Sequence, residues 1–146
     1  MYYKVSSAEF IAQFAKMREE YPVIRDNTST PTEIHKAAKF HDSYYLHHDS
    51  RSGFIVTGEG ELKGVFSAVK GRGDILVQSA VKRGATFLDC FDGYLVNLYQ
   101  RHGFGSWKIE PNWTPGGPAV HHMRYGAVSQ ADLAEAGRML QVIYGK

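Results

Sequence analysis

One segment, residues 66–104, constrains the fold more than any other part of the chain. It opens with an apolar run that stops at a basic loop with two glycines, Lys70-Gly71-Arg72-Gly73. An amphipathic helix pattern follows at 74–83, and a second apolar run spans 86–91. Strand, glycine loop, helix and strand in this order predict a βαβ unit. Such a loop predicts a phosphate-bearing ligand, because backbone N–H groups and the positive end of the helix dipole point toward it.

The composition is that of an ordinary globular domain. With 146 residues, 43% of them hydrophobic and 22% charged, the chain is long enough to bury a core, and we expect a single domain over residues 1–146. A formal net charge of +2 argues against nucleic acid as a partner. The single cysteine, Cys90, excludes an internal disulfide and fits a reducing compartment. No apolar window reaches membrane-spanning length, so we expect a soluble, cytoplasmic protein with no membrane partner.

Capping motifs and hydrophobic periodicity predict the remaining elements. Ser6 and Thr30 each precede a glutamate by three residues, which predicts helices over 7–21 and 30–40. The expected strands span 43–48, 53–57, 62–69, 86–91, 106–109 and 119–125, and the expected later helices span 74–83, 94–101 and 129–144. This order predicts an α+β fold, a mixed and mostly antiparallel sheet flanked by helices with one parallel crossover.

Two short motifs lie within the segment 66–104. The first is Gly71-Arg72-Gly73 followed by the apolar triplet Ile75-Leu76-Val77. The second is Leu98-Tyr99-Gln100-Arg101-His102-Gly103-Phe104, at the end of an expected helix. At this spacing they resemble the acetyl-coenzyme A motif and the Leu-Tyr-x-x-x-Gly-Phe motif of the GNAT superfamily of N-acetyltransferases. The flanking elements agree with that family in their order.

The resemblance implies an acyl-CoA-dependent N-acyltransferase, with acetyl-CoA as cosubstrate and a small-molecule or protein amine as acceptor. It also implies that Tyr99 is the general acid that protonates the departing thiolate. A phenol suits this role, since it is a neutral donor at neutral pH with an ordinary pKa of about 10. The other interpretation of Tyr99 is a core aromatic residue that packs with Phe104. The cofactor-binding residues that the resemblance implies are Val69, Lys70, Gly71, Arg72, Gly73, Asp74 and Asp92.

Three positions depart from the family pattern. The usual Arg or Gln falls at Ala68, and we expect Lys70 and Arg72 to supply the missing positive charge. Asp74 is expected to cap the following helix, where its charge competes with a bound pyrophosphate. Asp92 stands where many members have Asn. The departures leave two alternatives open: a non-catalytic GNAT-fold protein for binding or regulation, and a phosphate- or nucleotide-binding protein unrelated to CoA.

A general base is harder to assign. Transfer to an amine needs a group that removes a proton from the incoming ammonium. Glu59 and Glu61 precede the cofactor strand, and a solvated turn is their other interpretation. In the adjacent pairs His47-His48 and His121-His122, strand neighbours point to opposite faces, so we expect no metal site. One histidine of each pair is expected to face the core or the substrate groove, where it is a candidate base.

Three further features each leave two interpretations open. Cys90 is either a nucleophile for covalent transfer or a small buried residue. The loop 111–118, rich in proline and glycine with Trp113 at its centre, is either a wall of the acceptor groove or an ordered surface loop. The last expected helix, 129–144, either covers the sheet or forms a homodimer contact.

Overall fold

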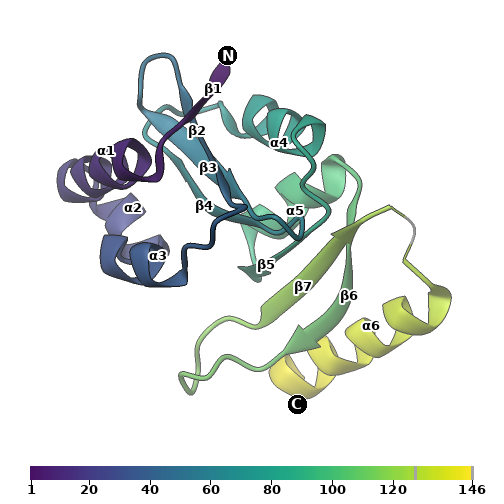
Figure 1. Cartoon of the computed structure of the whole chain (residues 1–146). Coiled ribbons are helices and arrows are strands. Elements are labelled where there is room, and N and C mark those ends of the chain that lie inside the picture. The colour runs from purple at the N-terminus through teal and green to yellow at the C-terminus, as the bar shows by residue number, and fades with distance from the viewer. Residues whose placement is uncertain (127, 146) are drawn as a thin grey trace. The chain divides into compact units, whose positions relative to one another are not determined.

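Two antiparallel sheets organise the chain, one in each of the units Met1–Ala85 and Thr86–Lys146 (Figure 1). The computed structural model describes residues 1–126 and 128–145. Across the first sheet lie β1 (Tyr2–Val5), β2 (Ser43–His47), β3 (Ser52–Val56) and β4 (Leu62–Ser67), in that order. Across the second lie β5 (Phe87–Phe91), β7 (Val120–Tyr125) and β6 (Phe104–Glu110). The predicted α+β class is confirmed.

The helices follow the expected order with one addition. They are α1 (Ser7–Glu20), α2 (Pro22–Asn27), α3 (Pro31–Ala37), α4 (Gly73–Lys82), α5 (Tyr94–Arg101) and α6 (Gln130–Tyr144). The prediction lacks α2, a helix of six residues that begins at Pro22 and is too short to show a period. It also lacks β1, because only Tyr2 of that strand is buried and no alternation results. Among the described residues, no helix has the length and apolar character needed to cross a membrane.

In the first unit, helices cover both faces of the sheet (Figure 1). One buried cluster joins α1, α2 and α3 to Tyr44 and Leu46 of β2. Tyr45 alternates to the opposite face, where the guanidinium of Arg83, at the end of α4, lies 5.2 Å from its ring centroid. The residues of the buried cluster are Phe10, Phe14, Met17, Ile24, Ile34, Tyr44, Leu46, Ile55 and Phe66.

In the second unit, α5 contacts β5 and β6, while α6 packs along β6 (Figure 1). Ala136 of α6 lies in a buried cluster with Ile109 and Ala119. The Tyr144 hydroxyl accepts the Ala119 N–H at 2.7 Å. The last helix therefore covers this sheet, which is one of its two expected roles, and the homodimer contact stays a prediction.

The strand pairing differs from the prediction in one respect. The βαβ pattern predicts a parallel pairing between β4 and β5, but every strand pair within the described residues is antiparallel. β4 pairs with β3, and β5 pairs with β7 from Phe87 to Phe91. Each is the last strand of its own sheet, so α4 follows an edge strand of the first sheet and precedes an edge strand of the second.

Candidate functional site

The glycine loop lies between the end of β4 and the start of α4. Gly71 has φ +82°, which glycine adopts without strain, and the space beside its Cα is open. Helix α4 begins at Gly73, with Arg72 as its N-cap residue and no capping hydrogen bond from that side chain. The first N–H groups of a helix have no partner inside the helix. The loop therefore fits the phosphate cradle that the sequence predicts.

Asp74 corrects one expectation, since it does not occupy the capping position. The helix begins one residue earlier than predicted, so Asp74 lies inside its first turn and is exposed. A carboxylate there interacts favourably with the helix dipole. A phosphate bound at the same helix end would compete with that carboxylate for the helix dipole.

Hydrogen bonds with Ser67 and Arg51 hold the start of the loop. The Ser67 hydroxyl donates to the Val69 carbonyl at 2.8 Å and accepts the Val69 N–H at 3.1 Å. The N–H of Ala68 donates to the Arg51 carbonyl at 2.8 Å. Because the Ser67 hydroxyl bonds both the N–H and the carbonyl of Val69, the backbone of Val69 is held in place just before the two glycines.

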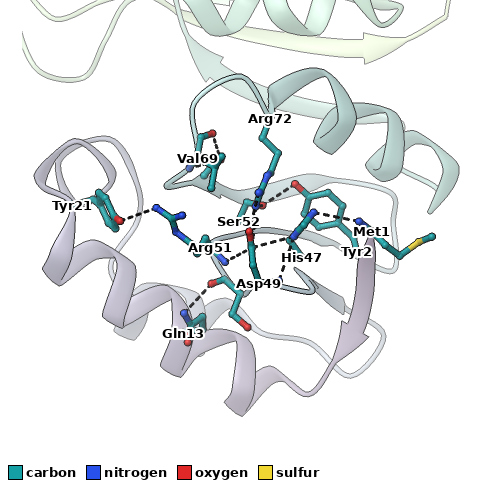
Figure 2. A network of polar contacts seen from close by, with 12 residues as sticks. Met1, Tyr2, Gln13, Tyr21, His47, Asp49, Arg51, Ser52, Val69 and Arg72 are labelled. Carbon is teal, nitrogen blue, oxygen red and sulfur yellow. Dashed lines mark hydrogen bonds and ion pairs between the residues drawn. The ribbon is translucent and has the colours of Figure 1, made fainter.

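The side chain of Arg72 extends from the loop toward the turn between β2 and β3 (Figure 2). Its terminal nitrogens donate to both carboxylate oxygens of Asp49, at 2.9 and 2.8 Å. One of them also donates to the Ser52 hydroxyl at 3.2 Å, which lies 2.9 Å from the Tyr2 hydroxyl. The hydrogen bond from Arg72 is the main reason why the pKa of Asp49 lies well below its usual range.

This ion pair changes the expected role of Arg72. The sequence predicts that Arg72 supplies positive charge to the phosphates, whereas the structure shows its guanidinium bound by Asp49. Lys70 remains exposed on the loop. Sequence reasoning missed the pair because the two residues are 23 positions apart and belong to no shared motif.

Tyr99 lies on α5 and is buried, with 4% of its surface exposed. Its ring meets Phe104 edge-on at a centroid distance of 5.9 Å, the packing contact of its alternative interpretation. Burial raises the pKa of Tyr99, with a smaller contribution from Cys90. The phenol is therefore protonated at neutral pH, which is the state that a general acid requires.

Cys90 is a protonated thiol in this environment. Burial, followed by the charges of Asp89 and Asp92, raises the pKa of Cys90 to about 12. Its sulfur lies 3.9 Å from the Met123 sulfur. Nucleophilic attack needs the thiolate, so these surroundings argue against covalent transfer and favour a small packed residue, which is half-buried.

Three side chains of the second unit form a hydrogen-bonded series, which we call the polar chain: Asp92, His121 and Ser106. Nδ1 of His121 lies 2.7 Å from the Ser106 hydroxyl, and Nε2 lies 2.9 Å from Oδ1 of Asp92. Ser106 and His121 are buried, whereas 36% of the Asp92 side chain is exposed. The sequence singles out Asp92 and His121 separately but does not predict that they meet.

One histidine of each adjacent pair turns inward, as predicted. His121 is buried, whereas His122 alternates to the other face and lies 2.6 Å from Oε2 of Glu110. In the first unit His47 is the inner histidine and His48 is exposed. Within the described residues, no group of three or more His, Cys, Asp or Glu side chains is arranged to hold a metal ion.

The remaining candidates for the acceptor side lie at the surface. Glu59 pairs with Lys39 at 3.4 Å, and both side chains are more than two-thirds exposed, which favours a solvated turn. With Glu61 they line a shallow hollow of about 270 Å³. Trp113 is 79% exposed, and its ring centroid lies 6.0 Å from that of Phe91, as expected of a surface loop.

Solved structures place the fold among known proteins, although no family model and no curated sequence matches the chain. An acyl-CoA N-acyltransferase from Pseudomonas aeruginosa superposes with a TM-score of 0.63 at 15% identity, over 86% of this chain and 99% of that one. Aminoglycoside 6′-acetyltransferase type Ii superposes with a TM-score of 0.60 at 13% identity, over 89% of this chain and 99% of that one. The ribosomal-protein-S18-alanine N-acetyltransferase from Escherichia coli superposes with a TM-score of 0.58 at 13% identity, over 89% of this chain and 96% of that one. The chain therefore has the fold of the GNAT acetyltransferases over most of its length, which confirms the fold that the resemblance implies.

Proposed function

We propose that this protein is an acyl-CoA-dependent N-acyltransferase that transfers an acyl group, acetyl in the first instance, to an amine. The observation that carries the proposal is the open glycine loop at the start of α4, where Gly71 has a positive φ and no side chain caps the helix from Arg72. In this proposal the two units act together as one GNAT-like domain. The residues assigned to the cofactor are Val69, Lys70, Gly71, Arg72, Gly73, Asp74 and Asp92.

The proposed chemistry divides between the loop and Tyr99. Acetyl-CoA supplies an acyl group activated as a thioester. Backbone N–H groups from Gly71 to Gly73 bind its phosphates and fix its position. The amine nitrogen forms the new bond to the carbonyl carbon as the carbon–sulfur bond breaks, and Tyr99 donates its proton to the thiolate.

A non-catalytic GNAT-fold protein is the second candidate function. It is favoured by the Asp49–Arg72 ion pair, which satisfies the one guanidinium on the loop, and by Ala68, which offers no polar side chain. Such a protein would keep the fold and use it to bind a ligand or partner. Turnover, measured beside binding, separates the two candidates.

Binding is tested first, by thermal unfolding with acetyl-CoA, coenzyme A and ATP. A ligand at a hundredfold excess over its Kd adds about 2.7 kcal/mol to the free energy of unfolding, so we expect both CoA species to raise the Tm and ATP to leave it unchanged. Gly73→Glu places a charge in the phosphate path and should abolish the shift. Gln78→Glu adds the same charge at an exposed position of α4 and should preserve it. No shift with either CoA species would end the enzyme proposal.

Turnover is tested by release of the CoA thiol with a panel of amines, including aminoglycosides and alanine-terminated peptides. We expect Tyr99→Phe to lower kcat and leave acetyl-CoA affinity intact. Tyr125→Phe is the matched control, because Tyr125 packs edge-on against the same Phe104 ring, at 5.4 Å. Equal activity in both variants would remove Tyr99 from the mechanism. Binding without turnover on any amine would leave the non-catalytic candidate.

A further inference from the structure

The proposed reaction leaves one task unassigned, the removal of a proton from the acceptor ammonium. The polar chain of Asp92, His121 and Ser106 ends in a carboxylate that is 36% exposed. Its other two members are buried. A ligand therefore reaches this chain at its carboxylate end.

Each ring nitrogen of His121 has one hydrogen-bond partner. An ionised Asp92 only accepts, so Nε2 of His121 carries a proton and donates it to Oδ1. When the ring is neutral, Nδ1 carries a lone pair and accepts a hydrogen bond from the Ser106 hydroxyl. The carboxylate selects the tautomer that points an N–H at Asp92, and the Ser106 hydroxyl, which can donate or accept, satisfies the other ring nitrogen.

The Asp92 carboxylate is also held from its backbone side. The Asp92 N–H donates to the Ala119 carbonyl at 2.8 Å, and Gly93 with φ +137° begins helix α5 directly after it. The bond to His121 uses Oδ1. Oδ2 is thus the carboxylate oxygen that His121 does not engage.

The other elements around His121 contribute neutral groups. On the neighbouring strands Cys90 and Ile109 lie opposite it in register, and burial keeps Cys90 a thiol by raising its pKa to about 12. From α5, the phenol of Tyr99 interacts with Cys90 and is protonated, since burial raises its pKa. Helix α6 contacts β6 through apolar side chains such as Ala136. Within the described part of the chain, Asp92 is the charged group bonded to the ring.

We propose that Asp92 is the general base of the acyl transfer, acting on a primary amine that is cationic in solution, and that His121 and Ser106 are positioning residues that orient its carboxylate. This inference rests on the proposed function and gives Asp92 a task beyond cofactor binding.

The ammonium gives one proton to Oδ2 of Asp92, which later releases it to water. The nitrogen then forms the carbon–nitrogen bond while the carbon–sulfur bond breaks. Its second proton replaces the one that Tyr99 gives to the thiolate, so the amide, the CoA thiol and one solvent proton are the products.

Asp92→Asn is the decisive variant, because it keeps the shape and still accepts the His121 N–H. We expect acetyl-CoA binding, measured by thermal shift, to be retained while kcat on the best amine of the panel falls at least about a hundredfold. Lost acetyl-CoA binding would make Asp92 a cofactor contact only, and an unchanged kcat would exclude it as the base; either result overturns the proposal.

His121→Leu and His121→Gln test the positioning role. Leucine removes the N–H donor and should lower kcat, whereas the glutamine amide can donate to Asp92 and should restore part of it. His122→Leu is the matched control, since His122 bonds a carboxylate on the other face of the same strand, and it should leave kcat unchanged. Equal losses in all three variants would show a structural role and overturn the assignment.

Nitrogen NMR of the histidine rings tests the geometry without substrate. Near pH 8 we expect the ring signal that disappears in His121→Gln to carry its proton on Nε2 alone. A ring protonated on Nδ1 contradicts the inference whatever the activity. A protein that binds no acetyl-CoA, or that binds it and acetylates no amine, removes the base together with the proposed function, whereas turnover indifferent to Asp92→Asn removes the base alone.

Discussion

The guanidinium of Arg72 is bound within the protein itself, by the carboxylate of Asp49. Its guanidinium makes two short hydrogen bonds to Asp49, with 16% of the Arg72 side chain and 30% of the Asp49 side chain exposed. The pair ties the loop before α4 to the turn between β2 and β3. Bidentate pairs of this kind are geometrically specific as well as attractive.

We predict that Asp49→Asn lowers the free energy of unfolding near pH 7 by about 1 kcal/mol, a modest value because solvent screens the pair. The pKa of Asp49 is lower in the folded state, so its stabilisation is present above the ordinary aspartate pKa and is lost as the pH falls. The difference from the wild type in urea unfolding should therefore shrink toward acid.

The control for this prediction is Asp26→Asn. Asp26 also pairs with an arginine, Arg25 at 3.2 Å, but both side chains are more than half exposed. Such pairs contribute little, so the variant should unfold like the wild type. A difference for Asp49→Asn that grows in acid would contradict the assignment of the pair.

At the scale of elements, glycine has opposite effects on stability in the loop before α4 and inside helix α6. Gly71, in the loop before α4, has φ +82°, whereas Gly137 lies inside helix α6, and both have open space where a side chain would stand. Contact with neighbours is therefore excluded as a cause of any difference between them. Backbone conformation alone decides.

We predict that Gly71→Ala lowers the free energy of unfolding by about 1 kcal/mol, because alanine is strained at positive φ. Gly137→Ala should raise it by about 0.5–1 kcal/mol, because glycine is a poor helix former. Urea unfolding of both variants beside the wild type measures the two signs. Effects of the same sign would show that the loop geometry is not the one described.

At the scale of the whole molecule, the question is whether the units Met1–Ala85 and Thr86–Lys146 behave as one domain. The chain offers separate probes for them. Both of its tryptophans, Trp107 and Trp113, lie in the second unit, so their fluorescence reports that unit. Helices α1, α2, α3 and α4 lie in the first unit and contribute the larger share of the helical circular dichroism.

We predict that the two signals change at the same temperature, as a single GNAT-like domain requires. Acetyl-CoA should then shift both curves equally, because binding to one cooperative folded state stabilises all of it. Separate midpoints, or a shift confined to one signal, would contradict the single domain.

Capping motifs show how much of the fold is predictable from neighbours in the chain. Ser6 accepts the Glu9 N–H at 3.1 Å, and Ser129 accepts the Asp132 N–H at 3.0 Å, each at a helix start that the sequence indicates. Such contacts join residues three apart. The residue pattern that allows them is local, so pattern reasoning finds them.

The sequence by itself determined the glycine loop, the helix that carries Tyr99 and the order of the elements other than β1 and α2, because each depends on short-range geometry and hydrophobic period. The tertiary structure decided which charges meet. Asp49 holds Arg72 across 23 positions, and Asp92 meets His121 across 29. These partners come together only when strands pair, and the pairing is antiparallel in both sheets where one parallel pair was expected. No local pattern records such distances, which is why the polar chain that we assign to catalysis lay outside the reach of the sequence.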